Sequence, residues 1–333
     1  MAMQTRHAPT PAGDPSGGPR LRAPRVKVRF ASGGAECAAW HYPGSNGACV
    51  IMTGGFAVTK EPGTDLFASR FHEAGYDVLA FDYRHFGESG GHPRQVAPIA
   101  GQLADWGAAI AFAPSLPGVD RDRLAVWSFS ASGGHIFRVA ARHPRLRAAI
   151  TQTPNADGLA ACRNAARHQK PGAFARFTGR ALLDAVGGGA GRAPRLVPLA
   201  GPPGTVAMLT TPDALDGDRA LRAERYPGWQ RQVAARSALR QGFYRPGRAA
   251  SRVECPLLVV VCEQDRSALA APAIRAAGLA PHSEVVRLAG THYAPFLDSH
   301  EQAVAAELSF LHRHLIDRRA PATDATRRGG GRA

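Results

Sequence analysis

The stretch RLAVWSFSASGGH, from Arg123 to His135, joins an apolar run to small residues and carries a serine at the junction. A strand that passes directly into a helix holds the residue at the turn exposed, and small residues two before and two after it prevent collisions. Ser130 meets this requirement, with Ser128 and Ser132 at those positions. The backbone N–H of Ala131, at the start of the helix, can face a developing oxyanion. Ser130 is therefore the candidate nucleophile, and a simple helix cap made by Ser128 or Ser130 is the alternative.

Short apolar runs suited to strands recur along the chain on both sides of this turn. Several are continuous in Val, Ile, Leu and Ala, as expected when both faces of a strand are covered. The runs are Val26–Phe30, Glu36–His41, Ala48–Met52, Asp77–Phe81, Leu124–Trp127, Ala148–Gln152, Pro256–Val261 and Glu284–Leu288. Helical patterns between them are Asp65–Ala74, Gly101–Ala113, Ser132–Arg142, Leu269–Ala277 and Glu301–Leu315. This alternation predicts an α/β fold with a mostly parallel sheet and helices on both faces.

One long segment interrupts the alternation. It has no clear strand, Gly and Pro recur in it, and helical patterns at Gly172–Ala185 and Ala220–Ser237 (broken at Pro227) favour a largely helical insertion, or cap. The ends of the chain are rich in Pro, Gly and Arg, a composition typical of disorder. The predicted parts are a disordered tail at 1–25, the first part of the core at 26–153, the cap at 154–253, the second part of the core at 254–316 and a disordered tail at 317–333.

Composition narrows the class of protein. The net charge of +15 comes almost entirely from arginines spread along the chain, which indicates a basic, solvated surface and not a nucleic-acid track. No apolar run is long enough to span a bilayer and no secretory signal is visible, so we expect a cytoplasmic protein without a membrane partner. Five cysteines without a C-x-x-C pair indicate neither a disulfide framework nor a zinc site.

Two loops that follow predicted strands carry further signals. TGGFAVTKE, residues 53–61, is glycine-rich, and its backbone can approach a bound carbonyl with the N–H of Phe56 as the donor; an ordinary turn that uses Gly54 and Gly55 is the alternative. FDYRHFGESGGHPRQ, residues 81–95, contains Asp82, Arg84, Gly87 and Ser89. We expect an Asp82–Arg84 pair and the turn glycine to pin this loop beside the first one, which is a structural role.

A serine nucleophile needs a general base, and His292 is the best candidate among 13 histidines. It follows the last strand in RLAGTHYAPF, where active sites of open α/β sheets assemble. His135 is the rival by proximity in sequence. The base in turn needs a carboxylate. Asp265, in CEQDRSA after a buried strand, is favoured over its neighbour Glu263, and Asp157 in TPNADG is the alternative acid.

With these residues in place, the chain resembles the α/β-hydrolase superfamily, in particular its serine aminopeptidase-like and X-Pro dipeptidyl-peptidase-like branch. The likeness runs from about Val26 to Ile316 and rests on TGGF, FDYRHFGESGG, SFSASGGH, CEQD and GTHY in this order. It implies an eight-stranded sheet, a cap after the sixth strand and a Ser–His–Asp triad. By position, the resemblance places the oxyanion hole at the N–H groups of Phe56 and Ala131.

Two departures from the family pattern stand beside this likeness. Relatives usually have His-Gly where this chain has Gly54-Gly55, which leaves the backbone donors in place but alters how the loop is braced. They usually have Gly where this chain has Ser128, and the larger residue is expected to crowd the turn and to reduce or remove activity. Neither departure removes a triad member.

The sequence therefore predicts a serine hydrolase of the carboxylesterase or thioesterase kind, which acts on a small-molecule ester, thioester or related acyl bond. Ser130 would attack, His292 would transfer the proton and Asp265 would orient His292, with no cofactor or metal required. An acyltransferase or thioesterase of polyketide-like biosynthesis and a non-catalytic binding protein of the same fold are the alternatives. The protein could form an oligomer, but no sequence pattern indicates its oligomeric state. Large cap residues that suggest a partly apolar pocket are Phe174, Phe177, Met208, Trp229, Phe243 and Tyr244; each is also compatible with simple core packing.

Overall fold

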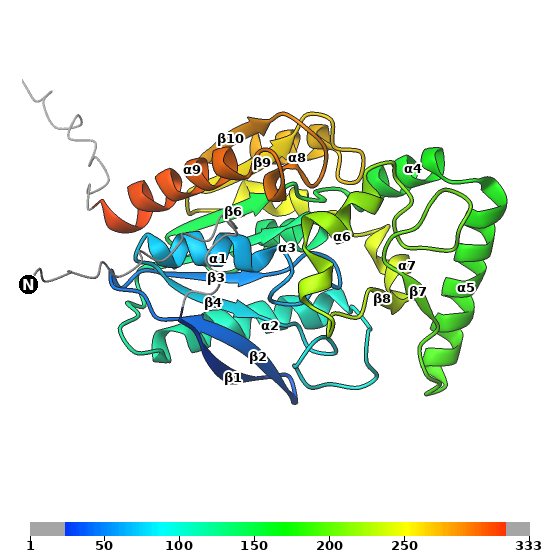
Figure 1. The fold of residues 1–333 in the computed structure, drawn as a ribbon, viewed down its shortest axis with the longest axis horizontal. Helices are drawn as coiled ribbons and strands as arrows, with labels where there is room; N and C mark the ends of the chain where they lie inside the picture. The colour runs from blue at the N-terminus through cyan, green and yellow to red at the C-terminus, as the bar shows by residue number, and fades with distance from the viewer. Residues whose placement is uncertain (1–23, 318–333) are drawn as a thin grey trace, which may run out of the picture.

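The computed structural model describes residues 24–317, and its main feature is a mixed sheet of eight strands (Figure 1). Only β1 pairs antiparallel with β2 and β2 antiparallel with β4; all other pairs in this sheet are parallel. In spatial order the strands are β1 (Val26–Ser32), β2 (Ala35–Tyr42), β4 (Asp77–Phe81), β3 (Cys49–Thr53), β5 (Leu124–Phe129), β6 (Ala148–Gln152), β9 (Leu257–Cys262) and β10 (Ser283–Leu288). The predicted fold class and number of sheet strands are confirmed.

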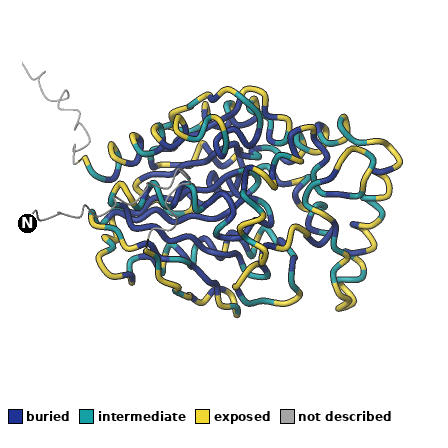
Figure 2. Tube along the Cα trace, in the orientation of Figure 1, coloured by how far each residue is buried: buried dark blue, intermediate teal, exposed yellow. Residues whose placement is uncertain are grey.

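Helices cover both faces of this sheet. One hydrophobic cluster joins a sheet face to α2 (Ile99–Phe112), α3 (Ser130–Ala140) and α8 (Ala270–Ala277). The other joins the opposite face to α1 (Thr64–Glu73) and α9 (His300–Leu311). Side chains of β9 alternate between the two clusters and all are buried, which is why that run is continuously apolar. Figure 2 shows the buried residues following the strands, with exposed residues on the outer helices.

The chain between β6 and β9 lies at one end of the sheet (Figure 1). Its longest helix, α5, is mostly exposed (Figure 2). Its elements are α4 (Gly158–His168), α5 (Pro171–Gly189), β7 (Leu196–Pro198), α6 (Gly217–Ala220), β8 (Gln232–Ala234) and α7 (Ser237–Gln241), with short helical turns η2 (Ala214–Asp216), η3 (Ala223–Arg225) and η4 (Pro246–Arg252). We call residues 154–253 the cap segment. The remaining short turns, outside it, are η1 (Ala113–Ser115), η5 (Ala294–Phe296) and η6 (His312–Ile316).

Three details of the sequence prediction are wrong. The cap segment contains a two-stranded antiparallel sheet, β7 with β8, where no strand was expected. No long helix occupies Ala220–Ser237, because α6 ends at Ala220 and the chain reverses at Arg222, which has a φ of 53°. Arg25, assigned to the N-terminal tail, donates a hydrogen bond of 2.7 Å to Asp65. Apart from residues 24, 25 and 317, the predicted disordered tails lie outside the described residues.

No helix within residues 24–317 is long and apolar enough to cross a membrane. All five cysteines lie in this range as free thiols; four are buried and Cys162 is exposed.

Candidate active site

Ser130 lies at a sharp turn between β5 and α3. Its φ of 59° is in the left-handed region that residues other than glycine rarely adopt. Two glycines of α3 provide space beside it: a Cβ on Gly134 would lie 2.4 Å from the carbonyl oxygen of Asn155, and one on Gly133 would lie 3.0 Å from Thr151 Oγ1. The small residues after the serine therefore allow the helix to pack directly against the sheet, while the strained backbone at Ser130 holds the candidate nucleophile at the turn.

The structure brings His292 and Asp265 to this serine. His292 follows β10 and Asp265 follows β9, at the carboxyl ends of neighbouring parallel strands. His292 Nε2 is 3.0 Å from Ser130 Oγ, and its Nδ1 is 2.7 Å from Asp265 Oδ2. The other carboxylate oxygen of Asp265 accepts hydrogen bonds from the backbone N–H groups of Ser267 (2.8 Å) and Ala268 (2.6 Å). The side chains of Ser130, His292 and Asp265 form one hydrogen-bonded line.

The surroundings of His292 favour a charged imidazole. The residue is 1% exposed, and burial alone would lower its pKa. The negative charge of Asp265, the hydrogen bond to it and the charge of Asp213 outweigh that effect and hold the pKa of His292 above its usual 6.5. With Nδ1 as the donor to Asp265, the lone pair of Nε2 faces the Ser130 hydroxyl, the orientation needed to remove its proton.

The glycine-rich loop after β3 packs against the same turn. A Cβ on Gly55 would lie 2.8 Å from the ring of Phe129, and one on Gly54 would lie 2.7 Å from the carbonyl oxygens of Val58 and Thr59. Phe56 lines the same cavity as Ser130. These contacts explain why both positions are glycine.

Ala131 is the second residue of α3, where the helix itself provides no acceptor for the backbone N–H. The structure thus brings Phe56 and Ala131, the two predicted oxyanion-hole residues, to the surroundings of Ser130.

Ser128 does not crowd the turn as the sequence suggested. Its side chain is fully buried, and its hydroxyl donates a hydrogen bond of 3.1 Å to the carbonyl oxygen of Thr53. It also lies 3.2 Å from Thr53 Oγ1, which donates to Tyr83 Oη at 3.0 Å. The hydroxyl therefore links β5 to the start of the glycine-rich loop on β3, in place of the empty space that a glycine would leave.

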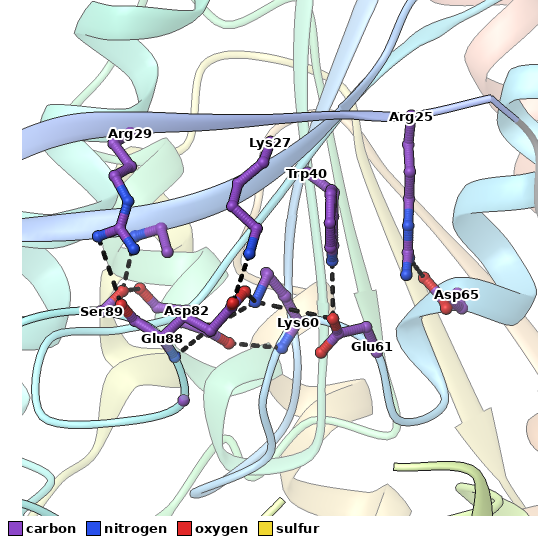
Figure 3. A network of polar contacts seen from close by, with 12 residues as sticks. Arg25, Lys27, Arg29, Trp40, Lys60, Glu61, Asp65, Asp82, Glu88 and Ser89 are labelled. Carbon is purple, nitrogen blue, oxygen red and sulfur yellow. Dashed lines mark hydrogen bonds and ion pairs between the residues drawn. The ribbon is translucent and has the colours of Figure 1, made fainter. Parts of the chain in front are cut away.

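The predicted Asp82–Arg84 pair is not formed. Asp82 binds Lys60 of the glycine-rich loop instead, through its Nζ (2.8 Å) and its backbone N–H (2.7 Å), as Figure 3 shows for the side chains. Lys60 Nζ also donates to Glu88 at 2.7 Å. Arg84 pairs with Asp105 of α2. The loop is pinned as expected, but by a buried lysine, because Lys60 is the cation that reaches the carboxylate.

The alternative candidates have other contacts. His135 Nδ1 is 2.9 Å from Tyr244 Oη, and burial lowers the pKa of His135 to about 3. Asp157 is the N-cap residue that precedes α4, where it accepts hydrogen bonds from two backbone N–H groups, and it pairs with Arg245. Glu263 is exposed. None of the three is hydrogen-bonded to Ser130 or His292 in the described part of the chain.

A cavity of about 510 Å³ opens beside Ser130. The cap segment forms most of its wall, with Leu215, Leu221 and Trp229 among the apolar contributors, and Trp229 Nε1 donates to the carbonyl oxygen of Ala57 at 2.9 Å. Asp218 and Arg231, which pair with each other, also line it. This is a volume suited to a small-molecule ligand.

Of the large cap residues singled out in the sequence, only Trp229 is among the lining residues. Phe243 is 86% exposed, and Tyr244 is directed to His135. The sequence did not single out Asp213 or Lys60, which hold the loops around the site. A buried lysine has no local sequence signature, and Asp213 lies in the segment with no periodic pattern. No cluster of His, Cys, Asp or Glu suited to a metal ion is found among the described residues.

Residues 52–307 match the model of the alpha/beta hydrolase family. The chain therefore belongs to the α/β-hydrolase family, as its fold and the turn at Ser130 suggested. It is similar to the quorum-quenching protein AidA of Acinetobacter baumannii (strain MDR-ZJ06), with 37% identity over 294 residues that cover 86% of this chain and 94% of that protein. The narrower likeness to the aminopeptidase-like branch stays a prediction.

Two further comparisons concern parts of the chain or the fold alone. The thiohydrolase of Eupenicillium brefeldianum is 35% identical over 138 residues, which cover 40% of this chain and 44% of that enzyme. The crystal structure of the alpha/beta hydrolase GrgF from Penicillium sp. sh18 aligns with a TM-score of 0.73 and 22% identity over 88% of this chain and 99% of that one.

Proposed function

We propose that this chain is a serine hydrolase that cleaves an ester, thioester or related acyl bond of a small molecule through an acyl-enzyme intermediate. The observation that supports it most is the hydrogen-bonded line from Asp265 through His292 to Ser130 beside a cavity of about 510 Å³. A serine that faces a histidine with a carboxylate partner is the arrangement that activates a hydroxyl near neutral pH.

In this mechanism His292 Nε2 removes the Ser130 proton as Oγ attacks the acyl carbon. The N–H groups of Phe56 and Ala131 stabilise the oxyanion of the tetrahedral intermediate. The imidazolium then gives its proton to the leaving alcohol or thiol, and Asp265 stabilises the positive charge while it lasts. A water molecule, activated by His292, hydrolyses the acyl-enzyme and restores the serine.

The relatives narrow the substrates to test. A relative named for quorum quenching favours a small signal molecule as the substrate. The proposed chemistry requires that this molecule carry an ester-type bond, and the cyclic ester of an acylated lactone is one that fits. A relative named thiohydrolase favours an acyl thioester as the second candidate, with water as the acceptor. The alternative acyltransferase reaction would use an alcohol in place of water. Both candidates react through an acyl-enzyme. The thiol of a thioester leaves as a separate molecule, whereas the alcohol released from a lactone stays attached to the acyl group.

The test of the proposed function is covalent labelling with a fluorophosphonate probe, which reacts with activated serines. Wild-type protein and the Ser128→Ala variant should label, while Ser130→Ala should not. Failure of the wild type to label, alongside a serine hydrolase that does, would contradict the proposal and favour a binding protein. Labelling that persists in Ser130→Ala would show that another serine reacts.

The substrate class is tested by rates on three matched series, namely acyl lactones, acyl thioesters and aryl esters with acyl chains of graded length. We expect kcat/KM to rise with chain length until the cavity is filled and then to fall. Product analysis with and without an added alcohol separates hydrolysis from acyl transfer. A protein that labels but turns over none of the three series would contradict the ester and thioester assignment.

A further inference from the structure

A carboxylate from the cap segment lies behind the candidate triad. Asp213, immediately before η2, is 3% exposed. Its Oδ1 accepts a hydrogen bond from Ser267 Oγ at 2.7 Å, and its Oδ2 accepts one from the backbone N–H of Arg266 at 2.8 Å. The backbone N–H of His292 lies 3.4 Å from the same Oδ2. One side chain thus contacts both the loop that carries Asp265 and the loop that carries His292.

These contacts connect the loop that carries Asp265 to the cap segment. Within the loop, Asp265 Oδ1 already accepts the N–H groups of Ser267 and Ala268, which leaves Oδ2 free for the imidazole. The cap segment adds Asp213, and Asn164 of α4 donates to the carbonyl oxygen of Arg266 at 2.6 Å. The position of Asp265 Oδ2 therefore depends on groups that are distant in the chain, 52 residues away for Asp213 and 101 for Asn164.

The charge of Asp213 also acts on the imidazole. The groups that face His292 are Ser130 from α3, Tyr293 with its ring at 4.8 Å between centroids, and the carboxylates of Asp265 and Asp213. Burial would raise the pKa of Asp213, but hydrogen bonds from Ser267 and Arg266 and the nearby His292 hold it below its usual value. Asp213 is therefore negatively charged near neutral pH.

We propose that Asp213 is a positioning residue of this site: it clamps the loops of Asp265 and His292 to the cap segment, and its charge stabilises the imidazolium form of His292. This inference rests on the proposed function for its catalytic meaning, but the charge effect on His292 exists with or without turnover. The same stretch of chain continues into Ala214, Leu215 and Gly217, which line the cavity, so one segment contacts both the ligand space and the triad loops.

The Asp213→Asn variant separates charge from clamping. The amide oxygen can accept from the Arg266 N–H while the amide nitrogen donates to Ser267 Oγ, which can itself turn toward Thr211 Oγ1 at 2.6 Å. Asp213→Ala removes the charge and the clamp together. Asp216→Asn is the matched control, because it removes a carboxylate of η2 that is only three residues away and whose side chain is 42% exposed.

The direct measurement is the pKa of His292 from NMR titration of histidine-labelled protein, with the His292→Gln variant identifying the resonance. Removal of one nearby charge in a partly screened site should lower this pKa by about 0.5 to 1 in Asp213→Asn. Asp216→Asn should leave it unchanged. A pKa that does not move in Asp213→Asn, or that moves equally in Asp216→Asn, would overturn the proposal whether or not the protein is an enzyme.

Fluorophosphonate labelling provides the second readout. Because labelling needs the neutral imidazole, a lower pKa moves the acid side of the pH–rate profile of Asp213→Asn to lower pH, with a plateau within about threefold of wild type. In Asp213→Ala the plateau itself should fall about tenfold or more, because the loops lose their anchor. Failure of the proposed function appears as absence of labelling in wild type, whereas failure of the clamp appears as equal plateaus in Asp213→Ala and wild type.

Discussion

The buried pair between Lys60 and Asp82 gives the sharpest expectation for stability. Both side chains are nearly inaccessible, at 1% and 0% exposed, and Lys60 Nζ lies 2.8 Å from Asp82 Oδ2. Asp82 also accepts the backbone N–H groups of Lys60 (2.7 Å) and Glu88 (3.0 Å). Asp82→Ala removes all three acceptor contacts and leaves an ammonium group buried, with Glu88 as its nearest remaining carboxylate at 2.7 Å.

Breaking a buried pair from one side costs about 3 to 5 kcal/mol, and the remaining contact with Glu88 places Asp82→Ala near the lower end, at about 3 kcal/mol. Lys60→Met should cost about 2 kcal/mol, because Asp82 keeps its two backbone donors. The double variant Asp82→Ala/Lys60→Met leaves no unpaired charge, so it should cost about 3 kcal/mol. The sum of the two single costs is about 5 kcal/mol, so the coupling energy between the two residues is about 2 kcal/mol.

The free energies of unfolding are measured by urea denaturation, and an m-value that is the same in all variants checks that unfolding is two-state. Glu284→Ala is the matched control: it breaks a pair of similar length with Arg313, but the two side chains are 48% and 44% exposed, so the cost should stay below about 1 kcal/mol. Strict additivity in the double variant, or a cost for Asp82→Ala no larger than that of the control, would refute the reasoning.

Three other variants have clear expected outcomes. Burial raises the pKa of Glu307 well above 4.5, so wild type loses stability as pH rises through the folded pKa. Glu307→Gln keeps an acceptor for Trp127 Nε1 and should become more stable relative to wild type from pH 5 to pH 8 in urea denaturation. A difference in unfolding free energy that does not change with pH would contradict this. Ser128→Ala should lose about 1 kcal/mol, because the Thr53 carbonyl oxygen loses its donor, yet keep fluorophosphonate labelling. Phe243→Ser should change the free energy of unfolding by less than about 0.5 kcal/mol, since Phe243 is 86% exposed. It should also leave the dependence of kcat/KM on acyl-chain length unaltered. A changed dependence would show that Phe243 contacts the substrate.

The sheet could be predicted because burial leaves a strong signal in each strand. In β3 and β9 every residue is buried, and continuous apolar runs of five or six residues bounded by loops are typical of strands covered on both faces. The strands β7 and β8 could not be predicted for the opposite reason. Each is three residues long, they pair across more than 30 residues of chain, and their pattern is too short for any period to appear.

In the candidate site, too, some residues could be predicted from the sequence and others could not. Ser130 follows β5 directly, and Asp265 and His292 lie three and four residues after the ends of β9 and β10, so topology alone brings them to one edge. The lysine that pairs with Asp82 and the Asp213 carboxylate that binds the Asp265 loop come from other loops, whose approach is a tertiary property. Arg84 is two residues from Asp82 and was the obvious partner, but Lys60 occupies that place.

The contacts around the triad explain how an imperfect motif is compatible with an ordered site. Two buried carboxylates, Asp82 and Asp213, each accept backbone N–H groups from a loop that carries a proposed catalytic group. Main-chain hydrogen bonds to a buried carboxylate fix a loop more tightly than side-chain packing alone, because an unpaired carboxylate there would be costly. Since a displacement of about 1 Å can cost a hundredfold in rate, these anchors should affect the proposed reaction more than the glycine-to-serine change at Ser128, whose hydroxyl is itself hydrogen-bonded.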